Sequence, residues 1–152
     1  MNTKVFKISP WFYGITMVPE DCWLQYGYAL LVIAGSDGDV SEPELEWLTI
    51  DLAEAVGVSE DIIEEWEDFD FEGADLHEIF KSINVKSFTS FNKLLIYDAI
   101  RMSYADDEYA AEEKEKVYEA AALLKIRNET VLSIESLVEM ERASDKLRTI
   151  IL

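Results

Sequence analysis

The sequence has little of several residue types, and each shortage excludes a class of protein. Cys22 is the single cysteine among 152 residues, so no disulfide framework can form within the chain, which favours a reducing compartment. His77 is the single histidine and is distant in sequence from Cys22, which disfavours a structural zinc site and a Cys–His catalytic pair. Neither a Gly-rich phosphate loop nor a Gly-x-Ser-x-Gly elbow occurs, so we expect a protein that is not an enzyme.

Positive charge and long apolar runs are also scarce. The chain has 13 Lys and Arg residues against 32 Asp and Glu residues, a formal net charge of −19, which repels nucleic acid and anionic membranes and attracts cations and basic proteins. The longest apolar stretch, residues 26–34, is far shorter than the ~20 residues that cross a bilayer. The N-terminal MNTKVFKISPWFYG lacks the features of a secretory signal. We therefore expect a cytoplasmic protein with no direct membrane insertion and no nucleic-acid partner.

Three prolines and six glycines leave long stretches free for helix, and apolar residues recur at spacings of three and four. Strand-like alternation is rare. This pattern predicts an all-α protein, a single compact domain of about seven helices. The expected helices cover residues 20–35, 42–56, 59–67, 75–83, 87 or 89 to 104, 110–125 and 128 to the C-terminus. Residues 1–19 are expected to form an N-terminal extension that packs on the core of the helical domain, residues 20–152.

An acidic turn in the stretch AGSDGDVSEPELEWL occurs a second time, 69 residues later. Asp37 then aligns with Asp106 and Glu44 with Glu113, so the seven-residue spacing between the two acids is kept. The apolar stripe of the following helix and the cap after it align as well. The repeat predicts two related halves, at about residues 20–67 and 88–140.

The two acids of each turn have several interpretations. Ser41 and Glu44 form a capping box, in which each side chain accepts from the other residue's backbone N–H. Ala110 replaces Ser41 in the second half, so the box is expected to be lost there, yet Asp106 and Glu113 remain. Their persistence favours either stabilisation of the helix dipole or coordination of a cation. If a pseudo-two-fold brings the turns face to face, their oxygen atoms suit calcium, magnesium or manganese.

Two known motifs resemble these turns. Residues 37–44 resemble the last two-thirds of an EF-hand loop, but Ile33 and Gly35 stand where that loop requires oxygen ligands, which disfavours an EF-hand. A better match is the signature Ala-Asp-Gly-x-[Val/Ile]-[Ser/Thr]-x-x-Glu after a buried helix, read here as GSDGDVSEPE (residues 35–44) and YADDEYAAEE (residues 104–113). Over roughly residues 20–140 the chain thereby resembles the tellurite-resistance TerB-like family.

This resemblance implies a compact all-α fold of about seven helices in two related halves. It also implies a role in the bacterial stress response, including resistance to tellurite and other toxic ions, as a binding or scaffolding module. The family's acidic cluster implies a divalent cation held by Asp37, Asp39, Glu44, Asp106, Glu108 and Glu113. Asp107 departs from the family by replacing the glycine of the second turn, so it must adopt a backbone angle that aspartate tolerates better than most residues.

The alternative function is a metal-independent, acidic protein–protein interaction adaptor. Residues 60–75 contain nine acids and no Lys or Arg, which is typical either of a solvated face or of a docking surface for a basic protein partner. Trp66, Phe69 and Phe71 would then be either interface anchors or core residues. A hydrolase that uses paired carboxylates is the least favoured alternative, and the oligomeric state stays open.

Overall fold

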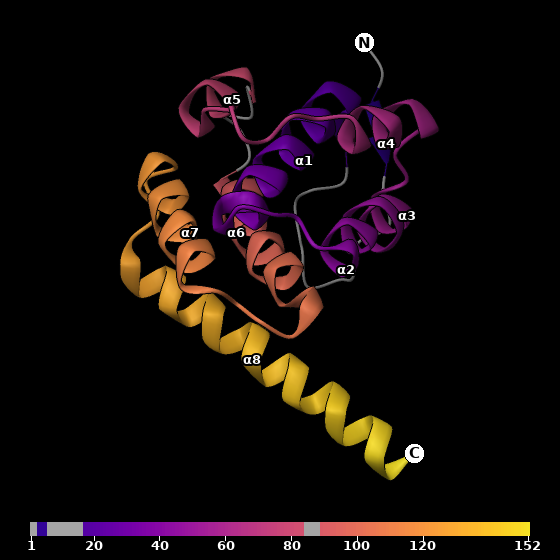
Figure 1. Ribbon diagram of the computed structural model, residues 1–152, viewed down its shortest axis with the longest axis vertical. Helices are drawn as coiled ribbons and strands as arrows, with labels where there is room; N and C mark the ends of the chain where they lie inside the picture. Colours follow the sequence, from indigo (N-terminus) through magenta and orange to yellow (C-terminus); the bar gives the residue numbers. More distant parts are fainter. Residues whose placement is uncertain (1–2, 6–16, 84–88) are drawn as a thin grey trace.

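The computed structural model describes residues 3–5, 17–83 and 89–152, and this part of the chain confirms the all-α prediction (Figure 1). The π-helical segment η2 (Trp47–Leu52) joins α2 to α3, so residues 42–56 form one continuous helix and the described residues form the seven helices expected. The helices are α1 (Glu20–Ala34), α2 (Glu42–Glu46), α3 (Ala53–Val56), α4 (Glu60–Glu67), α5 (Leu76–Ser82), α6 (Thr89–Ser103), α7 (Ala111–Leu123) and α8 (Asn128–Ile151).

Two short strands precede the helices. Strands β1 (Thr3–Val5) and β2 (Met17–Pro19) pair antiparallel, with Val5 opposite Met17. The predicted packing of the N-terminal extension on the core falls largely on residues 1–2 and 6–16, which lie outside the described residues.

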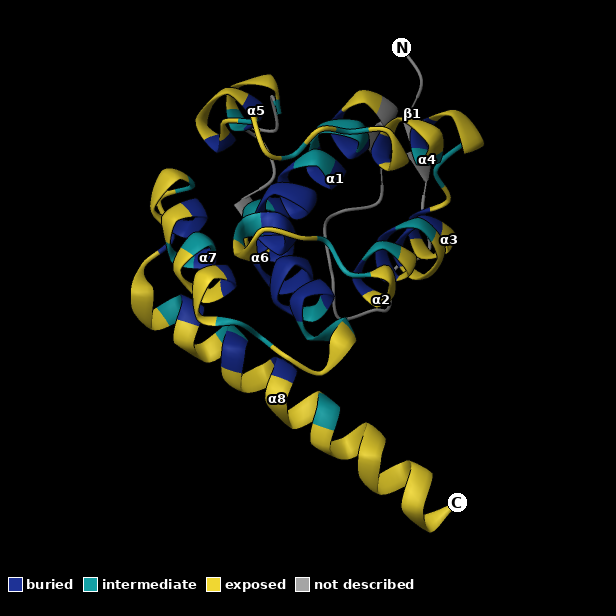
Figure 2. Cartoon of the chain, viewed as in Figure 1, coloured by how far each residue is buried: buried dark blue, intermediate teal, exposed yellow. Residues whose placement is uncertain are grey.

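Helices α1 and α6, the equivalent helices of the two halves, form the centre of the fold (Figures 1 and 2). Both are buried on nearly all sides, as the uniformly apolar sequence of α1 predicts. Their contact is aromatic: the ring of Tyr26 lies 4.9 Å from Trp23 and 5.0 Å from Phe91, between ring centroids. The Tyr26 hydroxyl donates a 2.5 Å hydrogen bond to the buried carboxylate of Asp98, which joins the two halves at the core.

The aromatic residues of the acidic connector belong to the core and are not exposed anchors. The indole of Trp66 is 1% exposed and donates to the carbonyl of Leu24 at 3.1 Å. The ring of Phe69 stacks on Tyr28 with 4.0 Å between centroids. Phe71 covers Gly35 closely, because a Cβ at that glycine would lie 2.3 Å from the ring. Trp66 is thus a core residue and Phe69 and Phe71 pack partly buried against the core, which favours the core interpretation of these aromatics, while the nine acids around them are all exposed.

Helix α8 packs only its first half on the body. Val131 and Val138 are buried against α6 and α7, whereas the residues after Arg142 are exposed and extend away from the other helices (Figures 1 and 2). None of the described helices has the length and apolar character needed to cross a membrane.

Candidate functional site: a crossed pair of acidic turns

The two acidic turns have the same backbone design. The 3-10 segment η1 (Gly35–Asp37) follows α1 and ends at Gly38, whose φ is 104°; η3 (Tyr104–Asp106) follows α6 and ends at Asp107, whose φ is 67°. Both residues adopt the left-handed conformation that reverses the chain. Asp107 therefore adopts the left-handed backbone conformation expected of the glycine that it replaces, as the sequence analysis predicted.

The side chains of Asp37 and Asp106 stabilise the chain reversal by hydrogen bonds within each turn. The Oδ1 atom of Asp37 accepts a hydrogen bond from the N–H of Asp39 at 3.2 Å, and Oδ1 of Asp106 accepts from the N–H of Glu108 at 3.1 Å. These are Asx-type turns, in which a side chain replaces a backbone acceptor. Each aspartate thus has a structural role of its own before any ligand is considered.

Glu44 and Glu113 both cap the helix they begin. The Oε1 atom of Glu44 accepts from the N–H of Ser41 at 2.8 Å, and Oε1 of Glu113 accepts from the N–H of Ala110 at 2.9 Å. The expectation that the capping box is lost in the second half is therefore wrong for this bond, because its donor is a backbone amide that alanine retains. Only the bond from the Glu44 N–H to the Ser41 hydroxyl, at 3.3 Å, has no counterpart.

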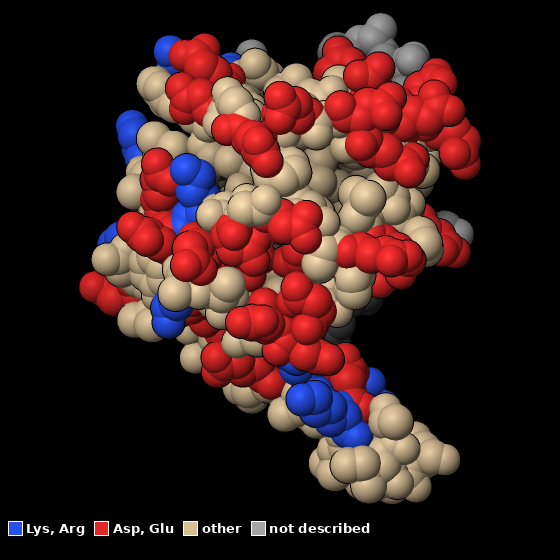
Figure 3. Space-filling model, in the orientation of Figure 1, with Lys and Arg blue, Asp and Glu red and all other residues tan. Residues whose placement is uncertain are grey.

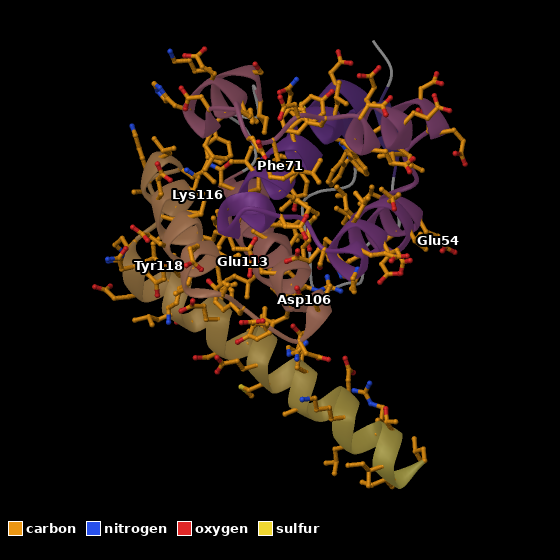
Figure 4. All side chains as sticks on the ribbon, viewed as in Figure 1. Glu54, Phe71, Asp106, Glu113, Lys116 and Tyr118 are labelled. Atoms are coloured by element: carbon orange, nitrogen blue, oxygen red, sulfur yellow. The ribbon has the colours of Figure 1, made fainter. Side chains whose placement is uncertain are left out.

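The tertiary arrangement brings the two glutamates together. Segment η1 packs on α7 and α2 packs on η3, so each turn lies against the helix of the other half. Glu44 and Glu113 are each only 1% exposed, and their carboxyl groups lie close enough for each to shift the pKa of the other. The negative charge of Asp37 raises the pKa of Glu113, and that of Asp106 raises the pKa of Glu44. Each aspartate therefore faces the glutamate of the other half, and we call this arrangement crossed (Figure 4 labels Glu113 and Asp106). The predicted convergence of the two turns is thus observed.

Burial dominates the electrostatics of this pair. Loss of hydration, together with the facing Glu44 and nearby Asp37, raises the pKa of Glu113 to about 9. Burial also raises the pKa of Glu44, but hydrogen bonds from Glu113 and from the Ser41 amide oppose that rise. At neutral pH the pair therefore keeps one proton, which the two carboxyl groups share. The two Oε2 atoms are buried and meet no other donor in the described part of the chain.

The six predicted metal ligands occupy three kinds of position. Glu44 and Glu113 lie inside, and Asp37 and Asp106 lie at the exposed rim within electrostatic reach of them. Asp39 and Glu108 are exposed and contribute their backbone N–H groups to the turns. Across residues 3–5, 17–83 and 89–152, no three carboxylate, imidazole or thiol side chains converge closely enough to hold a metal ion. The interior itself supplies two carboxyl groups.

Sequence reasoning missed the residue that fastens the second turn, Arg142 of α8. One guanidinium nitrogen lies 3.0 Å from Oδ1 of Asp107, another donates to the carbonyl of Tyr104 at 3.1 Å, and the group lies 4.4 Å from the centroid of the Tyr104 ring. Asp107 in place of glycine was a signal for such a partner, because it adds a carboxylate at the turn. No described residue makes an equivalent ion pair with the first turn.

A second missed cluster ties α7 to α8. The buried carboxylate of Glu135 accepts hydrogen bonds from the hydroxyls of Tyr109 and Tyr118, each at 2.9 Å. Burial and this carboxylate raise the pKa of Tyr118 to about 12, so the hydroxyl stays protonated and donates. These bonds hold the helix that carries Glu113 against α8.

Comparison with known proteins identifies the fold. No family model and no curated protein sequence matches the chain. A tellurite resistance protein from Nostoc punctiforme, known from its crystal structure, is similar to it with a TM-score of 0.73 and 26% sequence identity. The similarity covers 91% of this chain and 85% of the other. The chain therefore has the TerB-like fold, and its resemblance to the tellurite-resistance TerB-like family is confirmed.

Proposed function

We propose that this chain is a non-enzymatic domain of the bacterial toxic-ion stress response that binds a divalent cation between its crossed acidic turns. The observation that supports cation binding is the pair of facing carboxyl groups, Glu44 and Glu113, each with an Oε2 atom that meets no other donor among the described residues. Similarity to a protein named for tellurite resistance supports the stress-response class. A cytoplasmic location is part of this proposal.

The donor set fits a small hard cation. Carboxylate oxygens suit Mg²⁺, Mn²⁺ and Ca²⁺, but Ca²⁺ takes about six to eight oxygen ligands, whereas Mg²⁺ commonly uses one or two carboxylates and keeps its waters. The interior offers two carboxylates, so we favour Mg²⁺ or Mn²⁺. Glu44 and Glu113 would hold the ion, with Asp37 and Asp106 adding negative charge at the rim. A bound cation would replace the shared proton and compensate the charge of both glutamates.

The test is titration of chelator-stripped protein with Mg²⁺, Mn²⁺ and Ca²⁺, followed by calorimetry and thermal unfolding. We expect measurable heat and a rise in melting temperature at millimolar Mg²⁺ or Mn²⁺. Glu44→Gln and Glu113→Gln should each abolish both signals. Glu42→Gln is the matched control, because Glu42 is exposed at the start of the same helix as Glu44 and should bind as the parent does. No heat and no thermal shift with any of the three ions would contradict the proposal.

The exposed acidic face of residues 60–75 supports a second candidate function, docking of a basic protein. All nine of its acids are exposed, and acidic residues crowd the surface over α4 in Figure 3. Binding through this face would weaken with salt and would be unaffected by chelator, which distinguishes it from cation binding. Neutralising Glu64, Glu65, Glu67 and Asp68 together should release a partner recovered by pull-down. A partner that stays bound to this variant would rule out the face.

A further inference from the structure

Helix α8 has two apolar faces, and only one of them is used within the described chain. Its core face places Val131, Glu135 and Val138 against the body, and Arg142 is the last residue of that face to reach it. From residue 143 to the end, every residue is exposed. The outer part of the helix projects from the molecule as an arm, and its tip is free of charged residues in Figure 3.

The second face follows the spacing of a coiled-coil seam. Residues separated alternately by three and four positions lie on it: Leu137, Met140, Ser144, Leu147 and Ile151. The four apolar members are 47%, 69%, 56% and 67% exposed, in chain order. At ~100° per residue, Leu147 points about opposite to the core residue Val138. We call these five residues the outer stripe; no described residue covers it.

We propose that two copies of this chain associate by packing their outer stripes together, with the two α8 helices antiparallel. A seam of alternating three- and four-residue spacing is the pattern by which one helix pairs with another. The stripe covers two heptads, about 21 Å of helix at ~1.5 Å per residue. An interface of this size is small, so we expect a weak dimer that forms only at high protein concentration.

Charge favours a second copy as the occupant, and favours the antiparallel orientation. Glu141 and Arg148 lie along one edge of the stripe, so an antiparallel pair places Glu141 of each copy near Arg148 of the other. The Tyr97 hydroxyl, 2.6 Å from Oε1 of Glu141, orients that carboxylate. Arg148 now pairs with Asp145 of its own helix at 2.8 Å, but both side chains are exposed, so exchanging this partner costs little.

The distribution of charge over the molecule leads to the same orientation. The chain carries −19 overall, yet the arm, from residue 143 onward, holds Lys146 and Arg148 against one acid, Asp145. The arm is therefore the part of the protein where two copies can approach with little repulsion. Because the body is attached at the N-terminal end of α8, antiparallel pairing also places the two acidic bodies at opposite ends of the pair.

Sedimentation equilibrium over micromolar to millimolar protein tests the proposal. The apparent mass should rise from 17.4 kDa toward twice that value. Leu147→Glu and Ile151→Glu should each raise the dissociation constant by an order of magnitude or more. Thr149→Glu is the matched control, because it adds the same charge to the exposed arm but off the stripe, and it should dimerise as the parent does. Circular dichroism should show all three variants folded, since their positions do not contact the body.

A charge exchange tests the orientation. Arg148→Glu should weaken the dimer, and adding Glu141→Arg to the same chain should restore it, because the two charges then meet again with their signs reversed. A monomer at every concentration, a dimer that Leu147→Glu leaves intact, or a double variant that stays weak would each overturn the proposal.

Discussion

Replacing Glu113 with glutamine should remove the pH dependence that the buried pair gives to the stability of the fold. Burial raises the pKa of Glu113 to about 9, whereas a glutamate in an unfolded chain titrates near ~4.3. Between these values the folded protein holds a proton that the unfolded chain has released. The pair is therefore most favourable at low pH, and its contribution is lost as the pH rises toward the raised pKa.

The magnitude follows from the number of protons involved. One extra proton in the folded state lowers the free energy of unfolding by at most about 1.4 kcal/mol per pH unit, or about 2.7 kcal/mol between pH 5 and pH 7. Glutamine carries no titrating proton, and its amide can still donate to Glu44. The free energy of unfolding of Glu113→Gln, minus that of the parent, should thus increase by up to about 2.7 kcal/mol from pH 5 to pH 7.

Urea unfolding followed by tryptophan fluorescence measures this difference at pH 5, 6 and 7. Chelator is kept in every sample, because a bound cation would take the place of the shared proton. Glu112→Gln is the matched control: it removes a charge from the neighbouring exposed position, and its difference from the parent should be the same at all three pH values. A difference for Glu113→Gln that is also constant with pH would refute the shared proton.

Three further substitutions test the packing around the site and the core. Gly27→Ala should lower the free energy of unfolding by about 1–3 kcal/mol in urea, because its Cβ would lie 2.1 Å from Nε1 of the buried Trp66, whereas Gly73→Ala, with open space around the added atom, should change little. Arg142→Ala should lower the free energy of unfolding by about 1–3 kcal/mol in the same assay, since it removes the bonds to Asp107 and Tyr104. Arg127→Ala is its control and should lower this free energy far less, because the ion pair of Arg127 with Glu129 is exposed. Tyr26→Phe should lower the free energy of unfolding by about 1.5–3 kcal/mol at pH 7, because it removes the hydrogen bond to Asp98. The loss should be smaller at pH 5, because burial raises the pKa of Asp98 to about 6 and the charged carboxylate gains most from the donor. An equal loss at both pH values would contradict this.

Much of the fold could be predicted because its signals are local. The sequence predicts helices over residues 42–56 and 75–83; in the structure Gly57 ends the first with φ 73°, and Asp75 begins the second by accepting from the N–H of His77 at 3.0 Å. The left-handed angle at Asp107 was also predictable, since the repeat places it at a glycine position. Cap geometry and backbone angles depend on a few adjacent residues, so they can be read from the chain directly.

The chemistry of the site depended on contacts between distant residues. Glu44 and Glu113 occupy the first turn of a helix, where a glutamate usually faces water, and the repeat alone shows no more than that they are equivalent. Only the crossing of the two halves buries both and removes the water that would keep them charged. Arg142 reaches Asp107 from 35 residues further along the chain. The sequence by itself therefore determined the backbone shape of each turn. Tertiary packing decided the protonation of the buried glutamates, because the pKa of a carboxyl group depends on every group that surrounds it in space.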